Sequence, residues 1–260
     1  MEFFRHFSEI SRHRALVGAL TSRDLKARYR GSVLGFLWTF LNPLLLLLVY
    51  SLVFSVYFRV QMENYAVFMF TGLLPWVFFS QALNEATGAI TDAGSLVTKV
   101  MFPMQVLVSV RVWTNFINFL LSLPILALFY LGFGKPVTWT ALALPLVALV
   151  QLWFTYSLSL LLATACVFMR DTRHILNNVL TLWFFVTPIL YPPAQVPAAF
   201  QPLVKLNPAA LLAMAYHDAL FWGRWPNAKH LAAVAFLSLI FTWAGVKIFD
   251  TYKEYFAEKI

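Results

Sequence analysis

Long apolar stretches separated by short charged segments dominate this chain. Between successive Asp, Glu, Lys and Arg residues lie six long, mostly hydrophobic stretches. A helix needs about 20 mostly apolar residues to cross a bilayer, and continuous apolar stretches lack the alternation of a membrane barrel strand. The pattern therefore predicts an all-α integral membrane protein. Its six transmembrane helices are expected at roughly 33–58, 64–87, 107–133, 140–168, 174–191 and 230–249.

The first 30 residues have a different, amphipathic pattern. Their phenylalanines recur at helical spacing between charged residues, which predicts a helix that lies in the cytoplasmic interface of the membrane. The spacing from Thr21 to Asp24 is that of a capping box and predicts a second short helix that begins near Ser22. We therefore divide the chain into a cytoplasmic interface segment, 1–30, and a transmembrane domain, 31–260.

Six prolines interrupt the stretch 192–226, between the last two predicted spans. Proline at that density breaks a continuous helix. The apolar segment between Pro208 and Gly223 is too short to span a bilayer, so a re-entrant or interfacial outer helix is expected, covered by protein or lining a wet cavity. Within it, the neighbours His217 and Asp218 are expected to form a surface pair.

Composition and charge agree with a membrane protein. Hydrophobic residues make up 61% of the chain and charged residues 12%, and the single cysteine excludes a disulfide scaffold. With a cytoplasmic N-terminus, fourteen of the 19 Lys and Arg residues lie on the inner side, so the positive-inside rule places both termini in the cytoplasm. The net charge of +8 is then mainly a topology signal, and no nucleic-acid partner is expected.

Motifs for energy coupling and catalysis are absent from the sequence. The Gly-Lys pair nearest to a Walker A loop ends at Lys135 and is followed by Pro136 in place of Ser or Thr, so the chain is not expected to hydrolyse nucleotide itself. The rival function, a membrane-embedded glycosyl- or phosphotransferase, needs acidic residues at an interface. Its candidates, Asp92, Asp171 and Asp218, are widely separated in the sequence.

Aromatic side chains within the predicted spans are candidates for a substrate channel. Rings stack weakly on sugar faces, and Tyr and Trp add hydrogen bonds, although packing against protein or lipid is the simpler explanation for any one of them. The candidate channel residues are Trp76, Trp153, Phe154, Tyr156, Trp183, Phe184 and Tyr191.

Two groups of polar residues face the cytoplasm in this topology. The first group either anchors the chain to an anionic leaflet or attracts a phosphate-bearing lipid substrate. It consists of Arg23, Lys26, Arg28 and Arg30. The second group lies in the connections between predicted spans two and three and between spans four and five, which are either plain turns or contacts for a soluble partner. It consists of Asp92, Ser95, Lys99, Arg170 and Asp171.

Several sequence blocks together resemble the transmembrane subunit of ABC-2 polysaccharide exporters. The likeness is greatest to the O-antigen permeases, with the teichoic acid permeases next, and it covers essentially the whole chain in order. The blocks are Gly31–Pro43, Thr71–Ser80, Phe168–Asp171, Phe185–Pro192 and Leu206–Pro208.

The resemblance implies a half-transporter that forms a homodimer and pairs with two separate ATPase subunits. No cofactor is then expected in this chain, because ATP and Mg²⁺ bind to the partner. The cargo is a lipid-linked polysaccharide, most similar to O-antigen, carried from the cytoplasm to the periplasm across the bacterial inner membrane. Export of capsular polysaccharide, teichoic acid, a small lipid or a drug is the alternative.

The resemblance also assigns regions. It implies that residues 1–30 form the interface helix in contact with membrane lipids, that roughly 91–103 contacts the ATPase, and that 193–225 forms outer gate helices. The family has a basic residue after the outer-helix tyrosine where this chain has a histidine. The gate residues are Pro193, Pro208, Tyr216 and His217.

Overall fold

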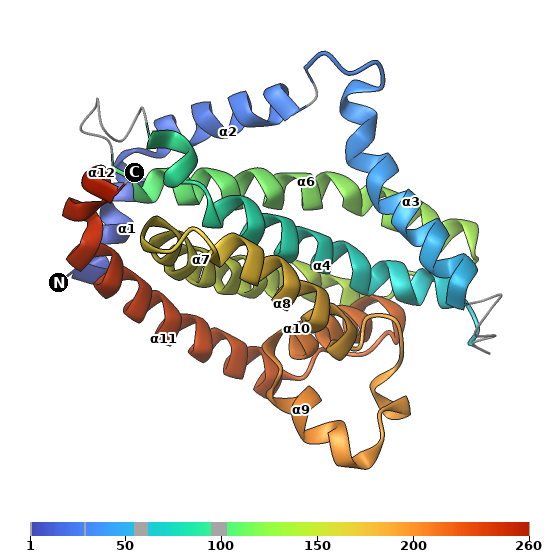
Figure 1. Cartoon of the computed structure of the whole chain (residues 1–260). Coiled ribbons are helices and arrows are strands. Elements are labelled where there is room, and N and C mark those ends of the chain that lie inside the picture. Colours follow the sequence, from blue (N-terminus) through green and yellow to red (C-terminus); the bar gives the residue numbers. More distant parts are fainter. Residues whose placement is uncertain (1, 29, 55–61, 95–102, 260) are drawn as a thin grey trace.

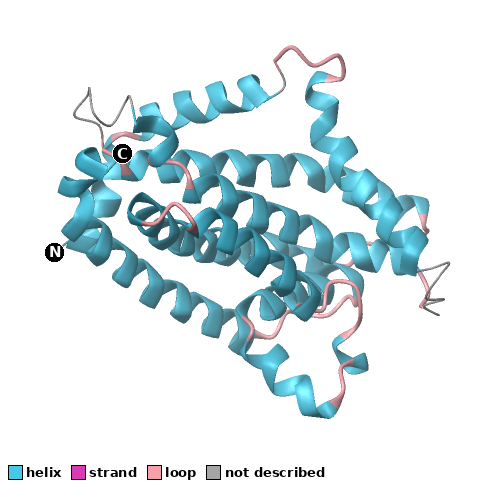
Figure 2. Ribbon diagram, viewed as in Figure 1, coloured by secondary structure: helices cyan, strands magenta, loops and turns pink. Residues whose placement is uncertain are grey.

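The computed structural model describes residues 2–28, 30–54, 62–94 and 103–259. Within these ranges the chain is helical, with loops and turns between the helices and no strand (Figure 2). The long helices lie side by side in one bundle, and the two chain termini lie at the same end of it (Figure 1). The all-helical part of the predicted fold is confirmed.

Four of the described helices are long and apolar enough to cross a membrane. They are α4 (Tyr65–Thr87), α6 (Gln105–Gly132), α7 (Leu144–Phe168), which a 3-10 turn at Trp139–Ala143 extends, and α11 (Ala228–Tyr252). They correspond to predicted spans two, three, four and six. α4 is the central helix, because it packs against both α6 and α7 and 78% of its most apolar window is buried.

The other two predicted spans contain shorter helices. α3 (Trp38–Leu52) and α8 (Thr172–Val186) have 15 residues each, fewer than a perpendicular crossing needs. α8 ends where Thr187 adopts the extended geometry favoured before Pro188. A 3-10 turn at Gly35–Leu37 precedes α3, and the last residues of the first predicted span, within 55–61, lie outside the described residues. The six-span arrangement stays a prediction.

The N-terminal segment forms two helices, α1 (Glu2–Arg12) and α2 (Arg14–Arg28). The predicted start of the second helix near Ser22 is wrong. α2 begins earlier because Val17 packs into an apolar cluster with residues of α6, which continues the helix through the capping-box spacing. Thr21 therefore lies buried within the helix and does not cap it.

Polar contacts hold this segment against the bundle. The His6 Nε2 atom lies 2.7 Å from the Tyr156 hydroxyl, and Gln105 donates a hydrogen bond to Glu9. Farther along α2, Arg111 Nη1 donates to Asp24 Oδ2 at 2.8 Å. α1 and α2 are thus docked on α6, α7 and α11 at the end of the bundle that carries the termini (Figure 1).

Short helices fill the connection between α8 and α11, at the other end of the bundle (Figure 1). Asn207 begins the principal one, because its Oδ1 accepts a hydrogen bond from the Ala209 amide at 3.0 Å, and Pro208 occupies the first turn, where its missing N–H costs nothing. The elements are 3-10 turns at Pro193–Gln195 and Ala198–Phe200, α9 (Gln201–Leu206), α10 (Pro208–Tyr216) and a π-helical turn at His217–Phe221. We call residues 187–227 the outer segment.

Docking of α1 should weaken in acid through His6. The pKa of His6 is lowered from 6.5 to about 4, mainly by burial. The negative charges of Asp250 and Glu9 raise this pKa, but by less than burial lowers it. An undocked His6 binds a proton near pH 6.5, so the stability that depends on neutral His6 is present above pH 6.5 and is lost as pH falls toward 4. Limited proteolysis of the purified protein should release α1 faster at pH 5 than at pH 7.5.

A His6→Gln variant is the control, because its amide still reaches Tyr156 but does not titrate. It should flatten the pH dependence. An unchanged pH dependence in this variant would show that another group controls docking.

Candidate functional site

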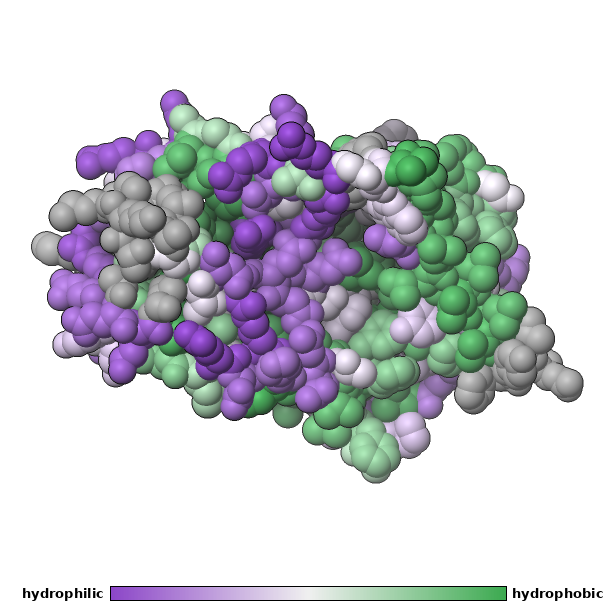
Figure 3. All heavy atoms as spheres, turned by 45° about the horizontal axis from the view of Figure 1, so that its top comes forward, coloured by the Kyte–Doolittle hydropathy of each residue, from purple (hydrophilic) through white to green (hydrophobic). Residues whose placement is uncertain are grey.

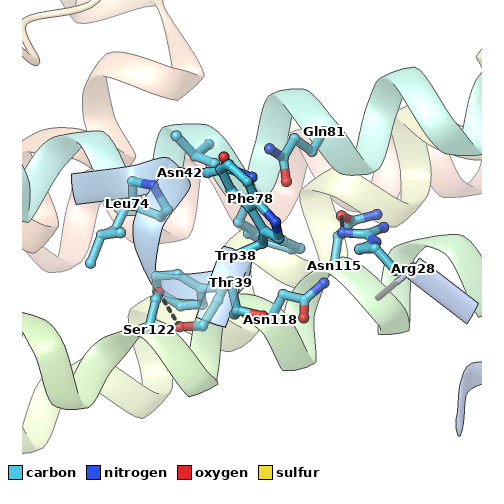
Figure 4. Close-up of a pocket in the computed structure, with 13 residues that line it drawn as sticks. Arg28, Trp38, Thr39, Asn42, Leu74, Phe78, Gln81, Asn115, Asn118 and Ser122 are labelled. Atoms are coloured by element: carbon cyan, nitrogen blue, oxygen red, sulfur yellow. Dashed lines mark hydrogen bonds between the residues drawn. The ribbon is translucent and has the colours of Figure 1, made fainter. Parts of the chain in front are cut away.

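A polar cavity of about 230 Å³ lies between α3, α4 and α6, next to the end of α2 (Figure 4). Amide and hydroxyl groups alternate with aromatic rings in its wall. We call it the inner cavity. Its polar residues are Thr39, Asn42, Gln81, Asn115, Asn118 and Ser122, and its rings are those of Trp38, Phe78 and Phe119.

Arg28 borders the inner cavity and is held by two partners. Its Nη2 atom lies 2.6 and 2.8 Å from the two carboxylate oxygens of Glu85, and its Nη1 atom donates to Asn115 Oδ1 at 3.3 Å. Asn115 in turn donates to Glu85 Oε2 at 2.9 Å. Because Glu85 neutralises Arg28, the charge at this border is compensated while the pair is closed.

Asn118 is the least satisfied group of the inner cavity. Both polar atoms of its side-chain amide are buried, and within the described part of the chain neither has a hydrogen-bond partner. A buried unpaired polar group costs about 1–3 kcal/mol. A ligand hydroxyl group that formed hydrogen bonds with the Asn118 amide would recover this free energy. A change in helix packing that exposed the amide to such a group would have the same effect.

A second cavity, of about 290 Å³, lies between α3, α4 and α8, and we call it the lateral groove. It adjoins the inner cavity along α4, since Val77 and Gln81 line both. None of the described residues that line the groove is Asp, Glu, Lys or Arg. Its polar residues are Ser80, Gln81, Asn84, Asn177 and Thr181, and its rings are those of Tyr50, Trp76, Phe184 and Phe185.

Hydrophilic and hydrophobic residues occupy different parts of the surface, as they do along the sequence. Figure 3 shows hydrophilic residues gathered over the end that carries α1, α2 and the termini and extending toward the middle, while hydrophobic residues cover the other end of this face. This division fits a polar end in water and an apolar body in a membrane.

The structure brings some of the predicted channel aromatics together. Trp76 and Phe184 line the lateral groove with ring centroids 5.6 Å apart. Trp183 packs against Trp76 with centroids 6.4 Å apart, and its Nε1 donates to Asn207 Oδ1 at 2.7 Å. A channel role for these residues stays a prediction, now tied to one groove.

The other predicted channel aromatics point elsewhere in this structure. Phe154 is fully buried and stacks on Phe79, while Trp153 donates to Thr242 of α11 at 3.0 Å. Tyr156 contacts His6 of α1, as described above. Tyr191 lines a separate, mostly apolar cavity of about 540 Å³ and donates to the Phe185 carbonyl at 2.8 Å.

The four predicted lipid-phosphate residues differ in availability. Lys26 and Arg30 are exposed. The Arg23 side chain is 66% exposed and lies 3.7 Å from Asp24. Arg28, at 27% exposure, is committed to Glu85. Within the described residues, Lys26 and Arg30 are the two members of this group without a carboxylate partner.

The predicted coupling residues lie at the end that carries the termini, as far as the structure describes them. Arg170 and Asp171 are exposed in the turn between α7 and α8. Asp92 follows α4 and accepts a hydrogen bond from Arg173 Nη2 at 2.6 Å. Ser95 and Lys99 lie outside the described residues. Arg173 is not among the coupling residues predicted from the sequence.

The outer segment is fixed to the bundle by buried hydrogen bonds. Tyr216 donates to Gln151 Oε1 at 2.7 Å. His217 Nε2 donates to the Phe68 carbonyl at 3.0 Å, and its ring stacks on Phe68 at 4.0 Å between centroids. Of the other predicted gate residues, Pro193 lies in a 3-10 turn and Pro208 at the start of α10.

The expected surface pair of His217 and Asp218 is wrong. His217 is 1% exposed and Asp218 is 9% exposed. Gly72 leaves the space that the imidazole fills against α4, and Asp218 pairs with Arg224 instead, at 2.7 Å. Neighbours in sequence are therefore committed to different partners.

No candidate metal centre is present among the described residues, which contain no group of three His, Cys, Asp or Glu side chains placed to hold an ion. Asp92 follows the last turn of α4. Asp218 lies in the outer segment next to His217, which contacts Phe68 near the beginning of α4. Asp92 and Asp218, two of the acidic residues that a transferase site would need, therefore lie apart in the structure.

Comparison with known proteins gives a consistent set of relatives. The family model described as ABC-2 type transporter matches residues 15–221. An O-antigen export system permease protein of Myxococcus xanthus is 45% identical over 254 residues, covering 97% of this chain and 98% of the relative. A protein of the same name from Klebsiella pneumoniae is 32% identical, covering 94% of each chain. A polysialic acid transport protein of Escherichia coli is 22% identical, covering 92% of this chain and 93% of its own.

Replacement of Gly72 by Ala should loosen the outer segment. The added Cβ would lie 2.9 Å from His217 Cε1 and Nε2 and 3.3 Å from Ile189 Cγ2, and overpacking of this kind costs about 1–3 kcal/mol. We expect a lower Tm in thermal unfolding of the detergent-purified protein.

Gly18→Ala is the matched control, because its Cβ would meet nothing within 4 Å. It should leave the Tm unchanged or slightly raised. Equal Tm values for the two variants would contradict the close packing of His217 on α4.

Proposed function

Because the chain belongs to the ABC-2 type transporter family, we propose that it is the transmembrane subunit of an ATP-driven exporter that carries lipid-linked O-antigen from the cytoplasm to the periplasm. The observation that carries the proposal is the 45% identity to an O-antigen export permease along nearly the full length of both chains. The E. coli polysialic acid transport protein, at 22% identity, makes capsule export the second candidate.

The proposed assembly is a homodimer with two separate ATPase subunits, in the bacterial inner membrane. The absence of a Walker A loop from the full sequence supports a division of labour in which the partner binds ATP and Mg²⁺. The positive-inside distribution of Lys and Arg supports cytoplasmic termini. In this topology α3 and α8 complete six spans, α1 and α2 lie at the inner interface, and the outer segment forms the gate.

The lateral groove is the proposed wall of the export route, with a second copy of the chain supplying the facing wall. Rings such as those of Tyr50, Trp76 and Phe184 would stack on sugar faces, and the amides of Asn84 and Asn177 would exchange hydrogen bonds with hydroxyl groups. Because the described lining of the groove contains no charged side chain, each of these contacts is weak. A polymer can then slide past without being trapped.

The exposed basic residues of α2, together with Arg30 beyond its end, are the proposed meeting point for the lipid pyrophosphate. Arg23, Lys26 and Arg30 are exposed, with Arg23 beside Asp24, and each contributes about 1 kcal/mol toward an anionic surface before screening. Arg28 would act later, because a phosphate must compete with Glu85 for its guanidinium. This order leads from the interface to the inner cavity.

The partner ATPase is proposed to contact the connection 91–103 and the turn between α7 and α8. The exposure of Asp92, Arg170 and Asp171 supports this. Ser95 and Lys99 belong to the same connection.

Deletion of this chain provides the direct test of the proposal. Lipid-linked polysaccharide should accumulate inside the cells and O-antigen should disappear from the surface, as measured by surface immunolabelling and by analysis of extracted lipid-linked glycans. Complementation with the chain should reverse both. Unchanged surface glycan after deletion would contradict the proposed function.

Removal of the positive charges of Lys26 and Arg30 should weaken binding of the lipid substrate without dissociating the complex of this chain with its ATPase. A Lys26→Ala, Arg30→Ala double variant should raise by about tenfold the substrate concentration that half-stimulates ATP hydrolysis at low salt, with a smaller effect at high salt. Arg12→Ala, an exposed basic residue of α1, is the control. Identical stimulation curves for the double variant and the wild type would exclude this contact.

A further inference from the structure

Arg173 joins the first turn of α8 to the end of α4. Its Nη2 atom donates to the Gly88 carbonyl at 3.1 Å, to Thr91 Oγ1 at 2.7 Å and to Asp92 Oδ1 at 2.6 Å. The acceptors lie 81 to 85 residues away in the sequence. One guanidinium therefore holds three successive points of the chain that leaves α4.

Gly88 makes this contact possible. A Cβ atom at this position would lie 2.1 Å from Arg173 Nη2 and 2.4 Å from its Cζ. A side chain here would occupy the place of the guanidinium. Since the guanidinium is the far end of a flexible side chain, Gly88→Ala would displace it while the chain retained all of its charged groups.

The two ends of this contact have different surroundings. Asp92 lies in the 3-10 turn Thr91–Ala93, within the connection that is proposed to meet the ATPase. Arg173 lies four residues before Asn177, on the helix whose Asn177, Leu180, Thr181 and Phe184 line the lateral groove. Arg173 thus connects the proposed partner contact with the proposed wall of the export route.

α8 is better suited than α4 to move when this connection is displaced. Residues of α4 are buried along most of its length, so its movement would disturb the core of the bundle. α8 buries Leu176, Leu180 and Phe184 on one side and exposes the other. A short helix with one buried side can tilt at a smaller loss of packing.

We infer that Arg173 is a positioning residue that transmits movement of the ATPase-contacting connection to α8, and thereby to the wall of the export route. The inference rests on the proposed function. Simple structural support explains the contact less well, because the side chains of Arg173 and Asp92 are 38% and 55% exposed, and exposed pairs typically contribute about 0–1 kcal/mol to stability.

The test uses the complex of this chain with its ATPase in proteoliposomes and measures lipid-linked polysaccharide exported per ATP hydrolysed. Arg173→Ala and Gly88→Ala should each lower this ratio at least tenfold, with ATP hydrolysis within twofold of wild type and an unchanged amount of co-purified ATPase. Arg173→Lys keeps the charge but loses the fork of the guanidinium and should give an intermediate ratio.

Arg5→Ala is the matched control, because Arg5, whose side chain is 58% exposed, forms another Arg–Asp pair between two helices, with the mostly buried Asp250. It should leave the ratio unchanged. A wild-type ratio in both Arg173→Ala and Gly88→Ala would overturn the inference, as would a parallel loss of ATP hydrolysis and export in all three test variants. Failure of the wild-type complex to export would instead count against the proposed function.

Discussion

Buried polar groups in the apolar body of this molecule depend on partners within the protein, because the hydrocarbon core of a bilayer offers none. Gln151 illustrates this constraint. Its amide donates to the Pro75 carbonyl of α4 at 2.8 Å and accepts from Tyr216 of the outer segment at 2.7 Å, so one side chain on α7 ties three elements together. Loss of either bond would leave a buried polar atom unpaired, which costs more than the bond itself contributes.

The same constraint explains how the outer segment is attached. Tyr65 donates to the Leu190 carbonyl and Thr140 to the Ala219 carbonyl, each at 2.7 Å. Together with Tyr216 and His217, these side chains hold the outer segment by discrete hydrogen bonds in addition to apolar packing. Such an attachment is specific, because each donor meets a defined acceptor.

Charged pairs and uncharged polar groups occupy different parts of the bundle for the same reason. At the end that carries the termini, pairs such as Arg28 with Glu85 and Arg111 with Asp24 fasten α2 to the bundle. The lateral groove, as far as its residues are described, is lined by uncharged side chains. A groove of rings and amides suits a hydroxyl-rich polymer. The charged end that carries the termini suits an anionic lipid and a soluble partner. In the proposed mechanism, uncharged groups in the groove therefore contact the polymer, and charged groups at the end that carries the termini contact the lipid and the ATPase.

The sequence predicted those features that depend on local pattern. Continuous apolar stretches located the long helices, and the prolines located the break between α8 and α11. The capping-box spacing misled, because packing of Val17 on α6 extends α2. The burial of His217 had no local signal, since it depends on the space beside Gly72. Arg173 could not be singled out either, because its partners are more than 80 residues away.

In the proposed function, this chain moves a sugar polymer while a companion protein hydrolyses ATP. The most direct measurement is time-resolved protection of lipid-linked O-antigen in proteoliposomes that contain this chain and its ATPase, with a lectin probing only the outer solution. We expect the polymer to cross the membrane when ATP is added on the side of the ATPase, and nothing to cross without ATP or with this chain alone. Equal movement by the chain alone would refute the proposed division of labour.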